Sequence, residues 1–165
     1  MARNFKEQGN EAYKMGPKGY PDAIKYYTQG LEQNCSDSSI NALLHLNRAA
    51  VQVSKQNFGL ALEDCRAALH LDRSAEGFEG VFLKGNLRAA KACLGLGMFQ
   101  DGLRHLEKIL QYSNSASVLD EATKLKKSTM EAQEEAERKA RELEKRSKVD
   151  KKIDILLKSR GISRE

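Results

Sequence analysis

The chain has 165 residues, of which 40% are hydrophobic, so it can bury the core of one domain but not of two large ones. It is rich in Ala, Leu, Lys, Glu and Arg and holds two prolines and no tryptophan, a composition that favours helices. The net charge of +5 comes from residues 124–165, which hold 14 basic and 9 acidic residues, because residues 1–123 hold 14 of each. A uniformly basic nucleic-acid-binding domain is therefore excluded. A membrane-spanning helix is excluded too, since no run of about 18 apolar residues is present.

In chain order, the first 115 residues predict six short helices arranged as three hairpins. Apolar residues recur at helical spacing, as in residues 23–31, where one face carries Ala23, Ile24, Tyr27 and Leu31. In residues 60–69, the packing face is expected to carry Leu60, Ala61, Cys65, Ala68 and Leu69. Between the helices lie groups of residues that end helices, among them glycine, proline, asparagine, aspartate and serine. These breaks fall at residues 15–19, 35–39, 55–57, 72–74 and 95–97.

The three hairpins share one spacing of small and aromatic residues, which indicates an internal repeat. A small residue in the first helix is followed by an aromatic residue that opens the second helix. Three and then seven positions later come two further packing residues. The three sets are Gly9, Tyr20, Ala23 and Gly30; Ala49, Phe58, Ala61 and Ala68; and Ala90, Phe99, Gly102 and Ile109.

This pattern resembles the tetratricopeptide repeat, whose period is about 34 residues. Here Gly9, Ala49 and Ala90 are 40 and 41 residues apart, and the additional residues fit the first turn and the loops between repeats. Gly30 and Ile109 depart from the family, which usually has alanine at these positions. The resemblance implies an all-α fold in which three tetratricopeptide helix hairpins form a right-handed superhelical groove, followed by a long C-terminal capping helix.

From residue 116 the sequence changes character, so we expect a repeat domain of residues 1–115 and a capping helix with a charged helical extension over residues 116–165. The cap is needed because a terminal repeat has no neighbour to cover its apolar face. Its apolar stripe comprises Val118, Leu119, Ala122 and Leu125. Five acid–base pairs at i,i+4 spacing then favour a solvated helix over a coiled-coil seam. They are Glu134–Arg138, Glu135–Lys139, Glu137–Arg141, Glu142–Arg146 and Glu144–Lys148.

A second apolar cluster comes near the end of the chain, at Ile153, Ile155, Leu156 and Leu157. It is too apolar to stand alone in water, which indicates a docking segment for a partner or for a further domain.

The reactive residues argue against an enzyme. His45, His70 and His105 fall in three different helices, without metal-ligand spacing or a nucleophile partner. The three cysteines form no Cys-x-x-Cys pair and are expected to be reduced thiols. We predict no catalytic residue, no cofactor and no metal site. The first residues lack an apolar signal core, which predicts a cytoplasmic protein, with the nucleus as a further location.

Five polar residues predict a binding site for a carboxylate. Lys6 and Asn10 are four residues apart and share one helix face, where an ammonium and an amide can hold a carboxylate together. The repeat register puts Asn47 on the corresponding face of the second hairpin, and Lys84 and Arg88, again four apart, on that of the third.

These five residues match, in type and repeat position, the carboxylate clamp of tetratricopeptide co-chaperones. In that family the clamp holds the C-terminal Glu-Glu-Val-Asp of heat-shock protein 90 or heat-shock protein 70. The resemblance implies that Lys6, Asn10 and Asn47 hold the terminal carboxylate. It also implies that Lys84 meets the aspartate side chain, and that Arg88 meets that side chain or the backbone upstream. Tyr13 resembles a family position that contacts the peptide, and an aromatic residue there can also simply pack.

The insertion in the first repeat, the segment 47–50 and the end of the charged helix at residues 156–162 look like the tetratricopeptide repeat protein four family and its essential fungal counterpart. That family usually continues into a second, C-terminal domain, so the resemblance allows for a further domain beyond residue 165.

Two other functions stay open. One is a general tetratricopeptide scaffold whose groove binds an internal segment of another protein. The other is contact with nucleic acid or the ribosome through residues 124–164, which is disfavoured because the lysines alternate with glutamates. The preferred chaperone is not distinguished, since both tails end alike; heat-shock protein 90 is the first expectation and heat-shock protein 70 the second.

Overall fold

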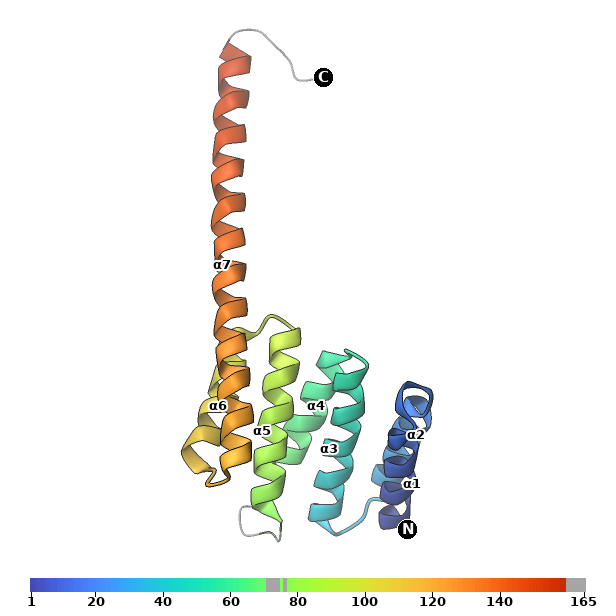
Figure 1. The fold of residues 1–165 in the computed structure, drawn as a ribbon. Helices are drawn as coiled ribbons and strands as arrows, with labels where there is room; N and C mark the ends of the chain where they lie inside the picture. The colour runs from blue at the N-terminus through green and yellow to red at the C-terminus, as the bar shows by residue number, and fades with distance from the viewer. Residues whose placement is uncertain (71–74, 76, 160–165) are drawn as a thin grey trace. The chain divides into compact units, whose positions relative to one another are not determined.

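The computed structural model describes residues 1–70, 75 and 77–159, and every regular element in these ranges is helical. The first hairpin pairs α1 (Ala2–Lys14) with α2 (Tyr20–Glu32) across the short 3-10 helix η1 (Gly16–Lys18). The second pairs α3 (Ser38–Ser54) with α4 (Phe58–Leu69), and the third pairs α5 (Phe78–Gly95) with α6 (Phe99–Tyr112). The long helix α7 (Ala116–Ser159) follows (Figure 1). The predicted all-α class, with three hairpins and a long C-terminal helix, is confirmed.

The helix ends follow the local chemistry of the sequence. Tyr20, Phe58 and Phe99, the aromatic residues of the repeat pattern, are the first residues of α2, α4 and α6. At the start of α3, the Asp37 carboxylate accepts hydrogen bonds from the backbone N–H groups of Ser39 (3.0 Å) and Ile40 (3.2 Å), which caps that helix. The break predicted at residues 72–74 lies outside the described residues.

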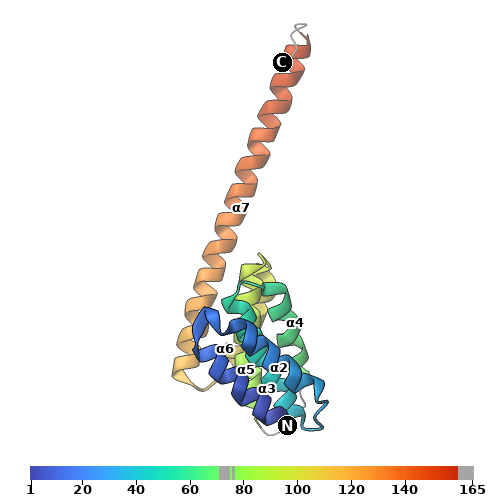
Figure 2. The ribbon, with the colours of Figure 1, turned by 90° about the vertical axis from the view of Figure 1, so that its right-hand side faces the viewer.

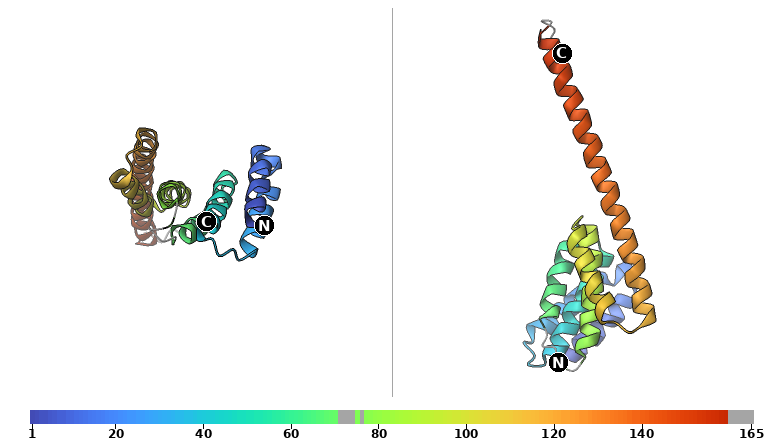
Figure 3. Two further views of the ribbon diagram at one scale, coloured as in Figure 1. Left: turned by 90° about the horizontal axis from the view of Figure 1, so that it is seen from below. Right: turned by 90° about the vertical axis from the view of Figure 1, so that its left-hand side faces the viewer.

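The helices of each hairpin pack on each other, and α3 also contacts both α1 and α5. Figure 1 shows α1, α3 and α5 following one another across one side of the domain. Figure 2 shows the first two hairpins from a second direction, and Figure 3 shows α5 beside α6 in the third. Because α3 lies between two neighbours, it is the helix on which the groups of the first and third hairpins can meet.

Two glycines of the repeat pattern allow a neighbouring side chain to lie directly on the helix backbone. A Cβ at Gly9 would stand 2.4 Å from the Tyr27 ring, and one at Gly30 would stand 2.9 Å from a methyl group of Leu44. The departure from alanine at Gly30 therefore has a packing reason, since Leu44, itself fully buried, occupies the space an alanine methyl would take.

The small residues of the repeat pattern form the core. Ala49, Ala61 and Ala90 are fully buried, as expected of positions where helices cross. Cys65 and Cys93 lie in the same core and are free thiols, and Cys35 is half-buried and also free. One expected packing position is wrong: Leu60, at the third residue of α4, is 52% exposed.

The chain divides into two compact units, Met1–Thr129 and Met130–Glu165. The first turns of α7 belong to the first unit, where Ala122 is fully buried in one apolar cluster with Ala90, Leu106 and Ile109. Val118 and Leu125 pack against the same cluster, so this part of α7 covers the third hairpin.

In the second unit, three of the expected i,i+4 ion pairs form, with N–O distances of 2.6 to 2.9 Å: Glu135–Lys139, Glu142–Arg146 and Glu144–Lys148. Of the apolar cluster near the end of the chain, Ile153, Ile155 and Leu156 are exposed.

Among the described helices, none is both long enough and apolar enough to cross a membrane.

Candidate carboxylate-binding site

The two asparagines of the predicted site are in direct contact. Asn10 on α1 and Asn47 on α3 are 37 residues apart in sequence, and the Asn47 Nδ2 group donates a hydrogen bond of 3.0 Å to Asn10 Oδ1. The same oxygen accepts a second hydrogen bond, of 2.8 Å, from the Tyr27 hydroxyl on α2. With its oxygen satisfied twice, the Asn10 amide keeps both Nδ2 hydrogens for another partner.

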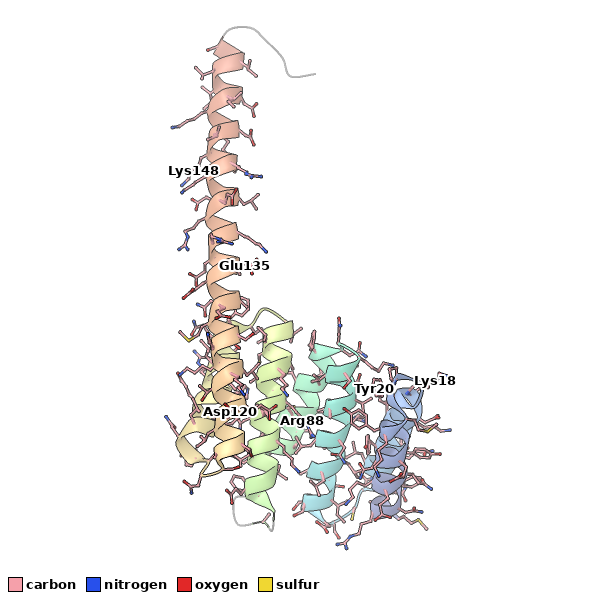
Figure 4. The ribbon with its side chains drawn as sticks, in the orientation of Figure 1. Lys18, Tyr20, Arg88, Asp120, Glu135 and Lys148 are labelled. Atoms are coloured by element: carbon pink, nitrogen blue, oxygen red, sulfur yellow. The ribbon has the colours of Figure 1, made fainter. Side chains whose placement is uncertain are left out.

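Arg88 reaches the same part of α3 from the third hairpin. Its Nη1 donates a hydrogen bond of 2.8 Å to the backbone oxygen of Leu46, the residue before Asn47. Figure 4 shows Arg88 on the side of α5 nearest α3. Burial lowers the pKa of Arg88 below its ordinary value, against smaller raising effects from Cys65 and Tyr13. Arg88 is thus a half-buried cation, held by a neutral carbonyl, that would gain from an anionic ligand.

The two lysines of the predicted site have no ion-pair partner within the described part of the chain. Lys6 is half-buried on α1, one turn before Asn10, and Lys84 is exposed on α5, one turn before Arg88. Charged side chains elsewhere in the first unit are commonly paired, for example Lys91 with Glu121 at 2.8 Å. Lys6 and Lys84 are therefore free to meet charge brought by a ligand.

Tyr13 is engaged with other parts of the protein. Its hydroxyl lies 3.2 Å from Ser54 Oγ at the end of α3, and its ring stacks on that of Tyr20 at 5.5 Å between centroids. The side chain is half-buried, so it combines packing with a partly exposed ring. Both roles considered for this residue, peptide contact and packing, remain compatible with its position.

Tyr27 was not identified from the sequence as part of the site, because it was counted only among the apolar residues of α2.

A buried polar network beside the site was also missed from the sequence. Asp64 accepts hydrogen bonds from Arg48 Nε (2.9 Å) and Nη2 (2.7 Å), and lies 2.8 Å from His45 Nδ1. Arg48 also donates to Thr28 Oγ1 on α2 at 2.9 Å. A charged pair at positions 48 and 64, in two helices of one predicted hairpin, was the signal that could have indicated it.

Asn10, Asn47 and Arg88 meet around one stretch of α3, with a lysine one turn before Asn10 and another one turn before Arg88. Amide N–H groups, a guanidinium and ammonium groups all donate hydrogen bonds, and Asn10 Oδ1, an acceptor among them, is already occupied by two donors. Such a set of donors suits an anion with several oxygen atoms. Within the described residues, no group of three or more His, Cys, Asp and Glu side chains could hold a metal ion.

The fold is that of a tetratricopeptide-repeat domain with a capping helix. Two solved structures share it. The Hsp90 co-chaperone Cns1 of Saccharomyces cerevisiae has a TM-score of 0.67 at 28% identity, over 98% of this chain and 50% of that chain. The second tetratricopeptide domain of human RPAP3, solved in complex with the HSP70 peptide SGPTIEEVD, has a TM-score of 0.59 at 28% identity, over 76% of this chain and 94% of that one.

The sequence relatives include Hsp70/Hsp90 co-chaperones and tetratricopeptide repeat protein 4, which confirms the predicted resemblance. The Hsp70/Hsp90 co-chaperone Cns1 of S. cerevisiae is 44% identical over 72 residues, covering 44% of this chain and 18% of that protein. Human tetratricopeptide repeat protein 4 is 35% identical over 111 residues, covering 67% of this chain and 26% of that protein. The chain spans between 18% and 43% of the length of the first curated relatives that it matches. No protein-family model matches the sequence.

Proposed function

We propose that this chain is a co-chaperone adaptor whose groove binds the C-terminal Glu-Glu-Val-Asp of heat-shock protein 90, and of heat-shock protein 70 as a second partner, through a carboxylate clamp. The observation that carries the proposal is the meeting of Asn10 and Arg88 on neighbouring residues of α3, Asn47 and Leu46. Donors from all three hairpins thereby converge where a short anionic peptide end could bridge them. Capture of a C-terminal carboxylate is an established mode of peptide recognition.

A peptide that ends in aspartate brings two carboxylates to this site. Lys6 and the amide N–H groups of Asn10 and Asn47 would hold the main-chain carboxylate. Lys84 would pair with the aspartate side chain, and Arg88 with that side chain or the backbone before it. Charge-assisted hydrogen bonds contribute about 1.5–3 kcal/mol each. After the cost of ordering a flexible tail, a dissociation constant on the order of micromolar, about −8 kcal/mol, is expected.

Three of the similar proteins support this choice of partner. The Cns1 relatives carry the name Hsp70/Hsp90 co-chaperone, and the RPAP3 domain was solved with a peptide ending in Glu-Glu-Val-Asp. Because that domain is covered over 94% of its length, the peptide SGPTIEEVD is a suitable first probe for this chain. A cytoplasmic location, with the nucleus as a further one, accompanies the proposal.

Calorimetry with SGPTIEEVD as the free acid and as the C-terminal amide tests the proposal. The amide removes the main-chain charge and keeps everything else, so we expect it to bind at least about tenfold more weakly, the equivalent of about 1.4 kcal/mol. Lys6→Ala and Arg88→Ala should weaken the free acid by at least as much. Lys25→Ala, which removes the same charge from an exposed position on α2, is the matched control and should bind as the unaltered chain does.

The rival function is a general scaffold that binds an internal segment of another protein. Such a scaffold would bind the free acid and the amide equally, because an internal segment has no terminal carboxylate. Equal binding of the two peptides, or unchanged binding in Lys6→Ala and Arg88→Ala, would therefore reject the clamp.

A further inference from the structure

Tyr27 contacts the proposed site from the buried side, through the side chain of Asn10. Its ring is 1% exposed and lies on the backbone of α1 at Gly9, where a Cβ would stand 2.4 to 2.8 Å from three ring atoms. Because Gly9 has no side chain, the ring comes close enough for its hydroxyl to donate a hydrogen bond of 2.8 Å to Oδ1 of the next residue, Asn10. In the described part of the chain, Tyr27 is the only residue of α2 that forms a hydrogen bond with any of the five predicted site residues.

The Asn10–Asn47 pair alone leaves two orientations open. In the observed one, Asn47 Nδ2 donates to Asn10 Oδ1, and Asn10 Nδ2 points away from this bond. If both amides rotated by 180°, Asn10 Nδ2 would donate to Asn47 Oδ1 with similar geometry, and Asn10 would present its oxygen in place of its two N–H donors. An oxygen there would repel a carboxylate.

The Tyr27 hydroxyl separates these two orientations. In the observed one, its hydrogen is bonded to Asn10 Oδ1. In the rotated one, the hydroxyl would face an NH₂ group, and its own hydrogen would be left buried without an acceptor, which is a costly arrangement. We propose that Tyr27 is a positioning residue of the site, whose hydroxyl holds the Asn10 amide with Nδ2 toward the ligand; this inference rests on the proposed function.

The ionisation of Tyr27 agrees with this role. Burial raises the pKa of its hydroxyl to about 12, against a lowering effect from Arg88 and with a small raising effect from Tyr13. The hydroxyl therefore stays a proton donor throughout the physiological range.

The first test compares Tyr27→Phe with the unaltered chain by calorimetry, using SGPTIEEVD as the free acid and as the amide. Phenylalanine keeps the ring in the core and removes only the hydroxyl. We expect the free acid to bind about two- to tenfold more weakly. The lower figure corresponds to two equally populated orientations of Asn10, and the upper one to the loss of one ordinary hydrogen bond. The amide should be affected less, because its NH₂ group can donate to a rotated Asn10, so the preference for the free acid should fall.

Tyr26→Phe is the matched control, a half-buried tyrosine on the same helix for which no bond to the site exists among the described residues, and it should leave both affinities unchanged. Asn10→Asp is a second variant, which tests the inference even if Tyr27→Phe does not fold. Aspartate keeps an acceptor for Tyr27 and Asn47 but directs an oxygen toward the ligand, so binding of the free acid should fall at least tenfold.

The outcomes separate this inference from the function on which it rests. If the unaltered chain binds acid and amide equally, the clamp itself is rejected, and the role of Tyr27 with it. If the unaltered chain prefers the acid, equal weakening of both peptides in Tyr27→Phe shows a merely structural tyrosine and overturns the inference. Unchanged affinities in Tyr27→Phe, or full binding of the free acid by Asn10→Asp, overturn it as well.

Discussion

Replacing Asp64 by asparagine should destabilise the repeat domain far more than the loss of a surface charge. The Asp64 side chain is 6% exposed and is held by Arg48 and His45, whose side chains are 22% and 25% exposed. Breaking a buried ion pair from one side costs about 3–5 kcal/mol. Because water reaches part of Arg48 and His45, we expect the lower figure of about 2–3 kcal/mol for Asp64→Asn. Asparagine also turns an NH₂ group toward one of the Arg48 donors.

Urea unfolding followed by circular dichroism at pH 7 measures this difference. The control is Asp101→Asn, which removes an acid whose pair with Arg104 is 2.8 Å long but exposed on both sides, and which should cost no more than about 0.5 kcal/mol. If Asp64→Asn costs no more than Asp101→Asn, the reasoning from burial is wrong.

The pH dependence of that difference gives an independent check. Burial raises the pKa of Asp64, but the hydrogen bonds and charges of His45 and Arg48 together outweigh it, so the pKa lies below its ordinary value of 3.8. A carboxylate with a lowered pKa stabilises the fold fully above its unfolded value and loses this contribution as pH falls through the folded one. The gap between the unaltered chain and Asp64→Asn should therefore shrink as the pH falls below about 4. A gap that does not shrink in this range contradicts the assignment.

Three further predictions concern packing, salt and thiol reactivity. Gly9→Ala should push the Tyr27 ring away. Overpacking should destabilise the fold by about 1–3 kcal/mol, offset by roughly 1 kcal/mol of gained helix propensity, and binding of the free acid should weaken. Gly59→Ala, whose methyl group would meet open space in α4, is the control, and thermal melts should show it to be neutral or stabilising. Raising the salt concentration from 50 to 500 mM should weaken the free acid more than the amide, and equal titration curves at both concentrations would contradict a charge-based site. The Cys65 thiol, whose pKa burial raises to about 12, should resist iodoacetamide at pH 8 in the folded protein and react only after denaturation, as mass mapping would show.

The fold could be predicted from the sequence because the signals that specify its helices are local. A helix that opens on Tyr20, Phe58 or Phe99 after a turn of small and polar residues is visible without any structure, and the structure starts α2, α4 and α6 at these residues. The reason for glycine in place of alanine at position 30 could not be predicted from the sequence, because it lies in the contact with Leu44 of a different hairpin. The prediction that Leu60 packs in the core was wrong, because this apolar residue at helical spacing lies on a face that the neighbouring helices do not cover.

The candidate site divides in the same way. The repeat register put Asn10, Asn47 and Arg88 on comparable faces of three helices, and in the structure all three meet on α3. What the register could not supply is the orientation of each polar group. The hydrogen bond of Tyr27 depends on how closely α2 approaches α1, and a buried aromatic residue at this spacing reads as core whether or not its hydroxyl is used.

The two contacts that end on Leu46 and Asn47 also bear on how the three hairpins unfold. One joins the first hairpin to the second, and the other joins the third to the second, so each is a nearest-neighbour contact in a linear array. Arrays of this kind can lose their end repeats one at a time. A peptide end held by Lys6 and Lys84 together would couple the first hairpin to the third, a contact that a linear array lacks. Occupied by such a ligand, the domain would unfold as one cooperative unit, with both ends protected from proteases at once.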